Sequence, residues 1–272
     1  MSLPRSPEIA ASFKLACSWT DGKPSWPAFA MPKLNGIRCM YVPGVGFFTR
    51  DGIPWHDGVL GQIETACRAQ QNWLDGELYG EGLSLQEING IVAINRSKNN
   101  PSPDIGRVQL HVFDLPQHGG GFRARQDDIR KGFAEGPGLR YVPFREVACE
   151  TQAGIAHDVN VSLGFEGTIY CSPGGYSPGK GWHTIKRKAW KDEDFAVLEL
   201  IKGKDGKYDH SLGAVKCITN NGVIFEVGSF AMTDAQRLEM FYADKKPTKA
   251  KVKYRELTKD GSPFHAQVLA LF

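Results

Sequence analysis

The stretch Met31-Pro32-Lys33-Leu34-Asn35-Gly36-Ile37-Arg38 places a lysine among apolar and small residues. Lysine is usually a solvated surface residue, but the apolar residues 28–32 lead directly into Lys33, which predicts that it is buried. Burial disfavours the charged form of an amine, and a neutral amine is a nucleophile. Taken alone, the pattern is more often that of a lysine at a strand end with its ammonium group in water. The motifs further along the chain decide in favour of the reactive amine.

The bulk composition is that of an ordinary globular protein, and 272 residues are enough for two domains. The six cysteines are scattered without a Cys-x-x-Cys spacing, which predicts free thiols in a reducing compartment and argues against a zinc site. No apolar run approaches a membrane span, and residues 1–19 lack the apolar core of a secretory signal. We therefore expect a cytoplasmic protein without membrane contact.

The distribution of charge is more informative than the net charge of +3. Residues 180–191 and 245–255 are basic stretches without a single acid. Such clusters suit a polyanionic partner, although a solvated face is the commoner cause of any one of them.

Hydrophobic patterning divides residues 1–190 into short strands and amphipathic helices. Residues 1–25 show no clear periodicity and are interpreted as a helical or irregular lead-in of unknown role, and 172–181 as a Pro/Gly-rich loop. Strands are expected within 29–40 (two, with a turn), 45–49, 73–79, 108–115, 140–147, 164–170 and 182–190, and helices at 59–70, 84–91, 122–133 and 151–163. Ser84 and Glu87 have the spacing of a capping box at the second of these helices.

The composition resets near residue 191, and three strands, a helix and two more strands follow. These are expected at 195–201, 213–219, 223–230, 233–242, 251–257 and 267–272, which is the order of an OB-fold, a small barrel that often binds nucleic acid. Lys251, Lys253 and Arg255 share one face of the fourth strand. They fit either an exposed edge strand kept soluble by cations or a phosphate-binding surface.

Five motifs stand in order before this C-terminal part. They are Lys33-x-Asn35-Gly36-x-Arg38, Asp75-Gly76-Glu77-Leu78, Val112-Phe113-Asp114-Leu115, Glu166-Gly167 and Lys186-x-Lys188. Each alone is weak, since a Glu-Gly pair or a Lys-x-Lys occurs by chance in most proteins. All five together, each on a predicted strand or strand end, carry much more weight.

From about Trp26 to Phe272, this series resembles the covalent nucleotidyltransferases, the superfamily of ATP-dependent DNA ligases, RNA ligases and mRNA capping enzymes. The similarity is greatest to the minimal two-domain ATP-dependent DNA ligases of bacterial and phage type, and Leu85-Gln86-Glu87-Ile88-Asn89-Gly90 supports that subgroup. It implies an α+β fold, with an adenylation (nucleotidyltransferase) domain of antiparallel sheets and flanking helices at 1–190 and an OB-fold β-barrel at 191–272. It also implies a monomer that seals nicks in double-stranded DNA.

The resemblance also implies roles for individual residues. Lys33 is the expected nucleophile, which takes AMP from ATP. Glu166 and Glu77 are the carboxylates expected at Mg²⁺ or Mn²⁺. The residues expected to contact ATP or AMP are Met31, Arg38, Arg50, Glu77, Phe113, Lys186 and Lys188, and those expected to contact nucleic acid are Arg38, Lys251, Lys253 and Arg255.

Two departures from the family pattern stand out. Asn35 occupies the position where these ligases usually carry aspartate, so an acceptor oxygen is kept while its charge is lost. Ser262-Pro263-Phe264-His265 also lacks the basic residues of a C-terminal element found in many larger members. An RNA ligase and a GTP-dependent capping-type enzyme remain alternatives, and Asn35 also raises the alternative of an inactive protein that binds nicked DNA.

Overall fold

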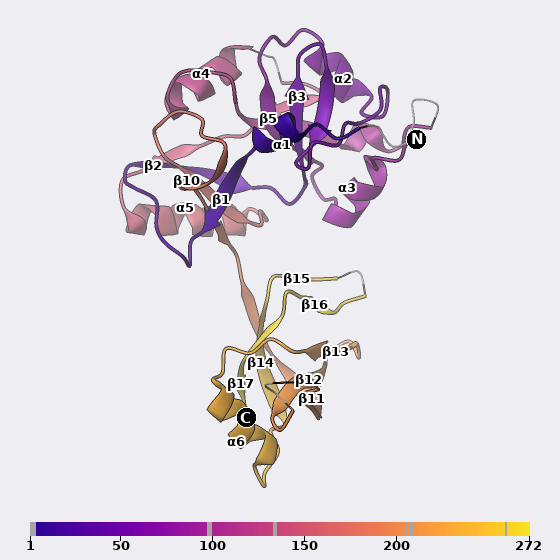
Figure 1. Cartoon of the computed structure of the whole chain (residues 1–272), viewed down its shortest axis with the longest axis vertical. Coiled ribbons are helices and arrows are strands. Elements are labelled where there is room, and N and C mark those ends of the chain that lie inside the picture. The colour runs from indigo at the N-terminus through magenta and orange to yellow at the C-terminus, as the bar shows by residue number, and fades with distance from the viewer. Residues whose placement is uncertain (1–3, 97–99, 133–134, 205, 207–208, 259) are drawn as a thin grey trace. The chain divides into compact units, whose positions relative to one another are not determined.

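The computed structural model describes residues 4–96, 100–132, 135–204, 206, 209–258 and 260–272. They form two compact units, Met1–Lys188 (unit 1) and Ala189–Phe272 (unit 2), where the sequence predicted a boundary after residue 190. Figure 1 shows unit 1 in the earlier colours of its bar and unit 2 in orange to yellow. Within the described residues, no helix is long and apolar enough to cross a membrane.

Unit 1 contains two five-stranded sheets, with the strand orders β1-β10-β9-β2-β8 and β4-β3-β5-β6-β7. The first sheet consists of β1 (Lys14–Ser18), β2 (Ala28–Lys33), β8 (Arg145–Val147), β9 (Gly167–Cys171) and β10 (Gly179–Lys188). The second consists of β3 (Ile37–Val42), β4 (Gly46–Thr49), β5 (Leu74–Tyr79), β6 (Gln109–Asp114) and β7 (Leu139–Tyr141). Residues 34–36 join β2 to β3, so the stretch around Lys33 is where the chain crosses between the sheets.

Helices flank these sheets (Figure 1). They are α1 (Pro7–Ala11), α2 (Gln62–Cys67), α3 (Leu85–Ile91), the 3₁₀ turn η1 (Ile105–Arg107), α4 (Phe122–Gly132) and α5 (Glu150–Ser162). The capping box predicted for α3 is present, with Ser84 and Glu87 satisfying each other's backbone N–H groups. Ala153 and Ala156 of α5 are buried against the first sheet, where their small side chains permit a close approach.

Three sequence predictions for unit 1 were wrong. The lead-in is part of the first sheet, since β1 pairs in parallel with β10. Residues 140–147 form two strands in different sheets, because β7 pairs with β6 and β8 with β2. Pro143 stands between them and has no N–H to continue a ladder. The helix expected at 59–70 is limited to Gln62–Cys67, because Gly61 before it has φ +51°, outside the helical region.

Unit 2 has a five-stranded sheet with the order β13-β12-β11-β14-β17. Its elements are β11 (Lys191–Lys202), β12 (Leu212–Ile218), β13 (Ile224–Val227), α6 (Asp234–Tyr242), β14 (Lys249–Tyr254) and β17 (Gln267–Leu271), and β15 (Glu256–Leu257) pairs with β16 (Pro263–Phe264). Three strands, a helix and two further strands are the predicted order. Sequence patterning missed only the short β16 among them, which it left as a loop.

Candidate active site

A cavity of about 280 Å³ in unit 1 brings the predicted nucleotide-site residues together. It is lined from both sheets, by Lys14, Leu15, Ala16, Met31, Pro32, Lys33, Leu34, Arg38, Arg50, Glu77, Phe113, Val142, Ile169, Cys171, Thr184, Lys186 and Lys188. Every residue that the sequence assigned to ATP or AMP is in this set. The lining combines apolar side chains with basic ones, which suits a flat ring joined to an anionic group.

Lys33 and Glu166 meet because their strands are paired. Lys33 is the last residue of β2 and lies opposite Gly167 at the start of β9, and the N–H of Glu166 donates to the Lys33 carbonyl (3.0 Å). Lys188 on β10 also lies opposite Gly167. Gly167 has φ +152°, and a Cβ there would lie 2.1 Å from the Arg187 carbonyl oxygen, so the backbone requires glycine directly after Glu166.

The Glu166 carboxylate forms ion pairs with the amines of Lys33 and Lys188. Burial acts to raise the pKa of Glu166, but the two lysines outweigh it and hold the pKa below its usual range. Both lysines retain about a fifth of their side-chain exposure, 19% for Lys33 and 20% for Lys188. Lys33 is therefore partly buried, at the edge of the cavity, with a carboxylate against its amine.

Glu77 is the second carboxylate of the site. It lies on β5 opposite Arg38 of β3, and the two strands approach closely at Gly36, where a Cβ would lie 2.2 Å from the Leu78 carbonyl oxygen. Burial raises the pKa of Glu77 to about 7, opposed by the charges of Arg38 and Lys33. Asn35 immediately precedes this contact and is partly buried.

The raised pKa of Glu77 predicts that the free energy of unfolding of the ligand-free protein depends on pH. A carboxyl whose pKa is higher in the folded than in the unfolded state stabilises the fold at low pH, and this stabilisation is lost as pH rises through about 7. We expect Glu77→Gln to raise the free energy of unfolding by roughly 1–2 kcal/mol at pH 8 and hardly at pH 5, after a discount for partial exposure.

Urea unfolding at the two pH values measures this effect. Glu81→Gln is the control, because Glu81 is exposed on the loop directly after the same strand. An equal gain for Glu77→Gln at pH 5 and pH 8 would contradict the assignment of the cost to ionised Glu77.

The apolar residues that line the cavity include Phe113 on β6. The Arg38 guanidinium lies over this ring, 4.5 Å from its centroid. Arg38 also forms a two-pronged ion pair with Asp75, through Nε–Oδ1 (2.6 Å) and Nη2–Oδ2 (2.7 Å). One face of Phe113 is thereby covered by a cation, and Arg38, which the sequence assigned to phosphate, is already paired with a buried carboxylate.

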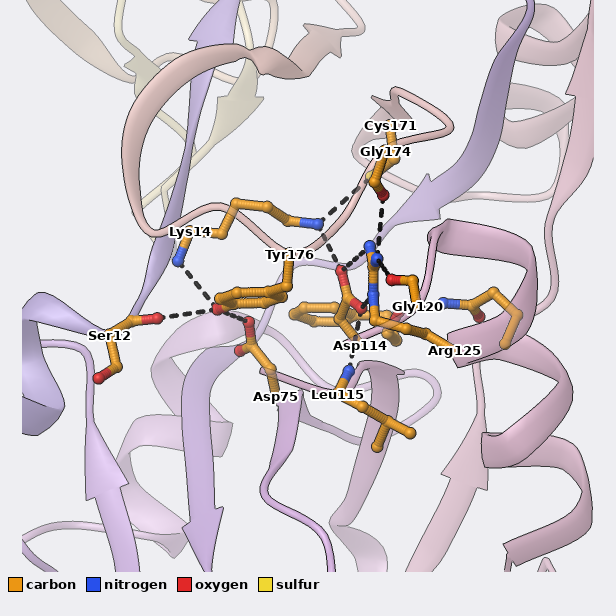
Figure 2. Close-up of polar contacts among 12 residues, drawn as sticks. Ser12, Lys14, Asp75, Asp114, Leu115, Gly120, Arg125, Cys171, Gly174 and Tyr176 are labelled. Carbon is orange, nitrogen blue, oxygen red and sulfur yellow. Dashed lines mark hydrogen bonds and ion pairs between the residues drawn. The ribbon is translucent and has the colours of Figure 1, made fainter. Parts of the chain in front are cut away.

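Five further residues at this site were missed by sequence reasoning: Lys14, Asp75, Asp114, Arg125 and Tyr176. Figure 2 shows all five in one polar network, and Lys14 of this network also lines the cavity. Asp75 and Asp114 stood inside recognised motifs but were given no role. Two acids on otherwise apolar strands did indicate buried partners, but nothing in the sequence pattern identified which residues those partners were.

Of the candidate nucleic-acid residues of unit 2, Lys251 and Lys253 lie on β14 and Arg255 directly follows it. Lys253 Nζ and the Arg255 guanidinium lie over the ring of Trp190, 4.5 and 4.8 Å from a ring centroid. Lys251 instead pairs with exposed Asp192 (3.0 Å). The predicted alternation along this strand is present, with Val252 and Tyr254 buried on the opposite face.

Comparison with known proteins shows which folds this architecture resembles. A search of curated sequences found no match. Residues 202–271 match the family model described as the DNA ligase OB-like domain. Among solved structures, the chain is similar to a Lig E DNA ligase (TM-score 0.72, 20% identity, 96% of this chain and 98% of that chain).

The chain is also similar to a Chlorella virus DNA ligase-adenylate (TM-score 0.53, 20% identity, 95% of this chain and 97% of that chain). A third similar structure is the ligase domain of M. tuberculosis LigD (TM-score 0.52, 16% identity, 95% of this chain and 94% of that chain). The class defined by this fold is the α+β nucleotidyltransferase joined to an OB-fold, which confirms the predicted fold class. Within that class, the chain has the two-part fold of the ATP-dependent DNA ligases, and unit 2 carries the ligase OB-like domain.

Proposed function

We propose that this protein is an ATP-dependent DNA ligase that seals nicks in duplex DNA through a lysyl-AMP intermediate. The observation that carries the proposal is the amine of Lys33, which is held against Glu166 at a cavity lined by apolar side chains and by the cations Lys186 and Lys188. The ligase OB-like domain in unit 2 supports DNA as the partner.

In the first step, a deprotonated Lys33 attacks the α-phosphorus of ATP. The new bond joins Nζ to phosphorus, the bond from the α-phosphorus to the bridging oxygen breaks, and pyrophosphate leaves with the electron pair, while the nitrogen releases a proton to solvent as the phosphoramidate forms. Charge neutralisation matters most in such phosphoryl transfers, and Lys186 and Lys188 supply it from the cavity wall.

In the second and third steps, AMP passes to the 5′-phosphate of a nick, and the 3′-hydroxyl then displaces AMP to restore the phosphodiester. The Phe113 face not covered by Arg38 offers a stacking surface for the adenine ring. Arg50 lines the same cavity at the end of β4, where its charge suits a phosphate.

The carboxylates fit a divalent metal of the Mg²⁺ type. Mg²⁺ is commonly held by one or two carboxylates together with substrate phosphates, and Glu166 and Glu77 are close enough to influence each other's charge. The described residues contain no group of three or more metal-binding side chains, so a metal here depends on the nucleotide for further ligands. When bound, it would neutralise charge on the phosphates.

In unit 2, Lys253 and Arg255 on Trp190 form a cationic, partly apolar surface that suits the sugar-phosphate backbone. Because phosphate contacts release counterions, we expect nick binding to weaken steeply as salt rises. Lys251 contributes less in this scheme, since Asp192 already neutralises it.

Incubation with α-labelled ATP or GTP and Mg²⁺, followed by a denaturing gel, tests the proposal. We expect label on the protein from ATP. Label from GTP instead would favour a capping-type enzyme, and no label from either would refute a covalent mechanism. A nicked duplex with DNA or RNA strands then separates a DNA ligase from an RNA ligase.

A further inference from the structure

We propose that Tyr176, on the loop between β9 and β10, is a positioning residue that fixes Arg38 at the nucleotide site through Asp75. The inference rests on the proposed function for its catalytic meaning, but its structural part can be tested without activity. Figure 2 shows the Tyr176 hydroxyl where the carboxylate of Asp75 and the segment from Ser12 to Lys14 meet.

The hydroxyl of Tyr176 is a junction of three contacts. It lies 2.7 Å from Asp75 Oδ2 and 3.1 Å from the Ser12 carbonyl oxygen, and it accepts a hydrogen bond from the Lys14 N–H (3.0 Å). A phenol has one hydrogen to donate, and the charged, nearer Asp75 oxygen is the better acceptor. Burial and the neighbouring Asp75 raise the pKa of Tyr176, so the hydroxyl keeps this proton.

Asp75 is fully buried and transmits the contact to Arg38. Its Oδ2 receives both the Tyr176 hydroxyl and Arg38 Nη2. Arg38 Nη2 also donates to the Lys14 carbonyl oxygen (3.2 Å), which closes a ring of contacts between β1, β3, β5 and the loop. Within the described residues no group accepts from Arg38 Nη1, so that end of the guanidinium is left for a ligand in the cavity.

The loop that carries Tyr176 is itself held in place. The carbonyl of Pro173 accepts from the Phe122 N–H (2.9 Å), and the carbonyl of Gly174 accepts from Arg125 Nη1 (3.0 Å). The sequence predicted this segment only as a Pro/Gly-rich loop. α4 anchors the loop at two points, and the anchored loop holds the Tyr176 hydroxyl against Asp75.

The first test reads the position of Arg38 directly. In protein labelled with ¹⁵N-arginine, the Arg38 Nε–H, assigned by its absence in Arg38→Lys, should be protected from hydrogen exchange by Asp75. We expect Tyr176→Phe to speed that exchange at least tenfold. Tyr41→Phe is the matched control, a buried ring on β3 whose hydroxyl makes no side-chain hydrogen bond within the described residues. Unchanged protection in Tyr176→Phe would overturn the proposal.

The second test measures single-turnover labelling by α-labelled ATP in Tyr176→Phe, Arg38→Ala and the double variant. We expect Tyr176→Phe to slow labelling by about 10- to 100-fold, since small displacements of a positioned group have costs of this order. The double variant should then match Arg38→Ala, because Tyr176 acts through Arg38. Additive losses would mean general destabilisation and would overturn the proposal.

The two tests separate the two ideas. If wild-type protein takes no label while Tyr176→Phe still frees the Arg38 Nε–H, the positioning contact stands and the ligase mechanism falls. If labelling is normal and the exchange of Arg38 is unchanged, the proposed function stands and the role of Tyr176 falls.

Discussion

Lys33→Ala is expected to form no covalent nucleotide, and sealing of a nick with ATP should fall by roughly 10⁴-fold or more. The reason is chemical: without the amine there is no atom to carry AMP between the nucleotide and the nick. Denaturing gels with α-labelled ATP, and intact-mass measurement of an added adenylyl group, check the first part. Lys33→Arg should fail equally, because it keeps the charge near Glu166 but offers no nucleophilic amine.

A pre-adenylylated nick gives the matched control for this variant. Sealing of that substrate does not use the lysine as a nucleophile, so Lys33→Ala should retain most of the wild-type rate. Lys186 and Lys188 line the same cavity and could also accept label. If label persists in Lys33→Ala and peptide mapping places it on either of them, the nucleophile has been assigned to the wrong residue.

Sequence reasoning predicted the part of the candidate site around Lys33 because its residues stand at strand ends within recognisable motifs. Lys33, Glu166 and Lys188 come together since β2, β9 and β10 are neighbours in one sheet, with Gly167 opposite both lysines. Periodicity predicted those strands well, and family resemblance predicted that they meet. The roles of these residues stay predictions until variants are measured.

The supporting network could not be predicted in the same way. Lys14 and Asp114 are 100 residues apart in the chain, and Asp75 and Tyr176 are 101 apart. Local sequence patterns carry no information on such long-range pairings. The burial of Lys14 was also unexpected from its residue type, because charged side chains are rarely buried without partners. β1 was missed for a related reason: it is a short strand whose burial does not alternate from residue to residue, and it depends on β10 for its pairing.

Charge counting within that network leads to a second strong prediction. Asp114 is fully buried and receives Lys14 Nζ and Arg125 Nε (2.5 Å), so two buried cations share one anion. Burial acts to raise the pKa of Asp114, but the two cations outweigh it and hold the pKa below its usual range. The carboxylate therefore stabilises the fold above the ordinary pKa of an aspartate, and that stabilisation is lost as pH falls through the lower folded-state pKa.

Asp114→Asn keeps the shape of the side chain but leaves both cations buried without an anion. We expect it to lower the free energy of unfolding of unit 1 by about 3–5 kcal/mol at pH 7, the usual cost of breaking a buried pair. Lys14→Met removes the surplus cation and leaves Arg125 and Asp114 as a balanced pair, so its cost should be within about 1 kcal/mol. Urea unfolding followed by tryptophan fluorescence compares the two.

The comparison of these two variants tests charge balance itself, because both remove one contact of the same network. If Lys14→Met destabilises unit 1 as much as Asp114→Asn, the network is held by packing around the lysine stem and not by its charges. The double variant provides a second form of this test, in which the cost of Asp114→Asn is measured with and without Lys14→Met. Asp114→Asn costs less in the Lys14→Met background if charge balance governs the network, since only Arg125 is then left without a partner.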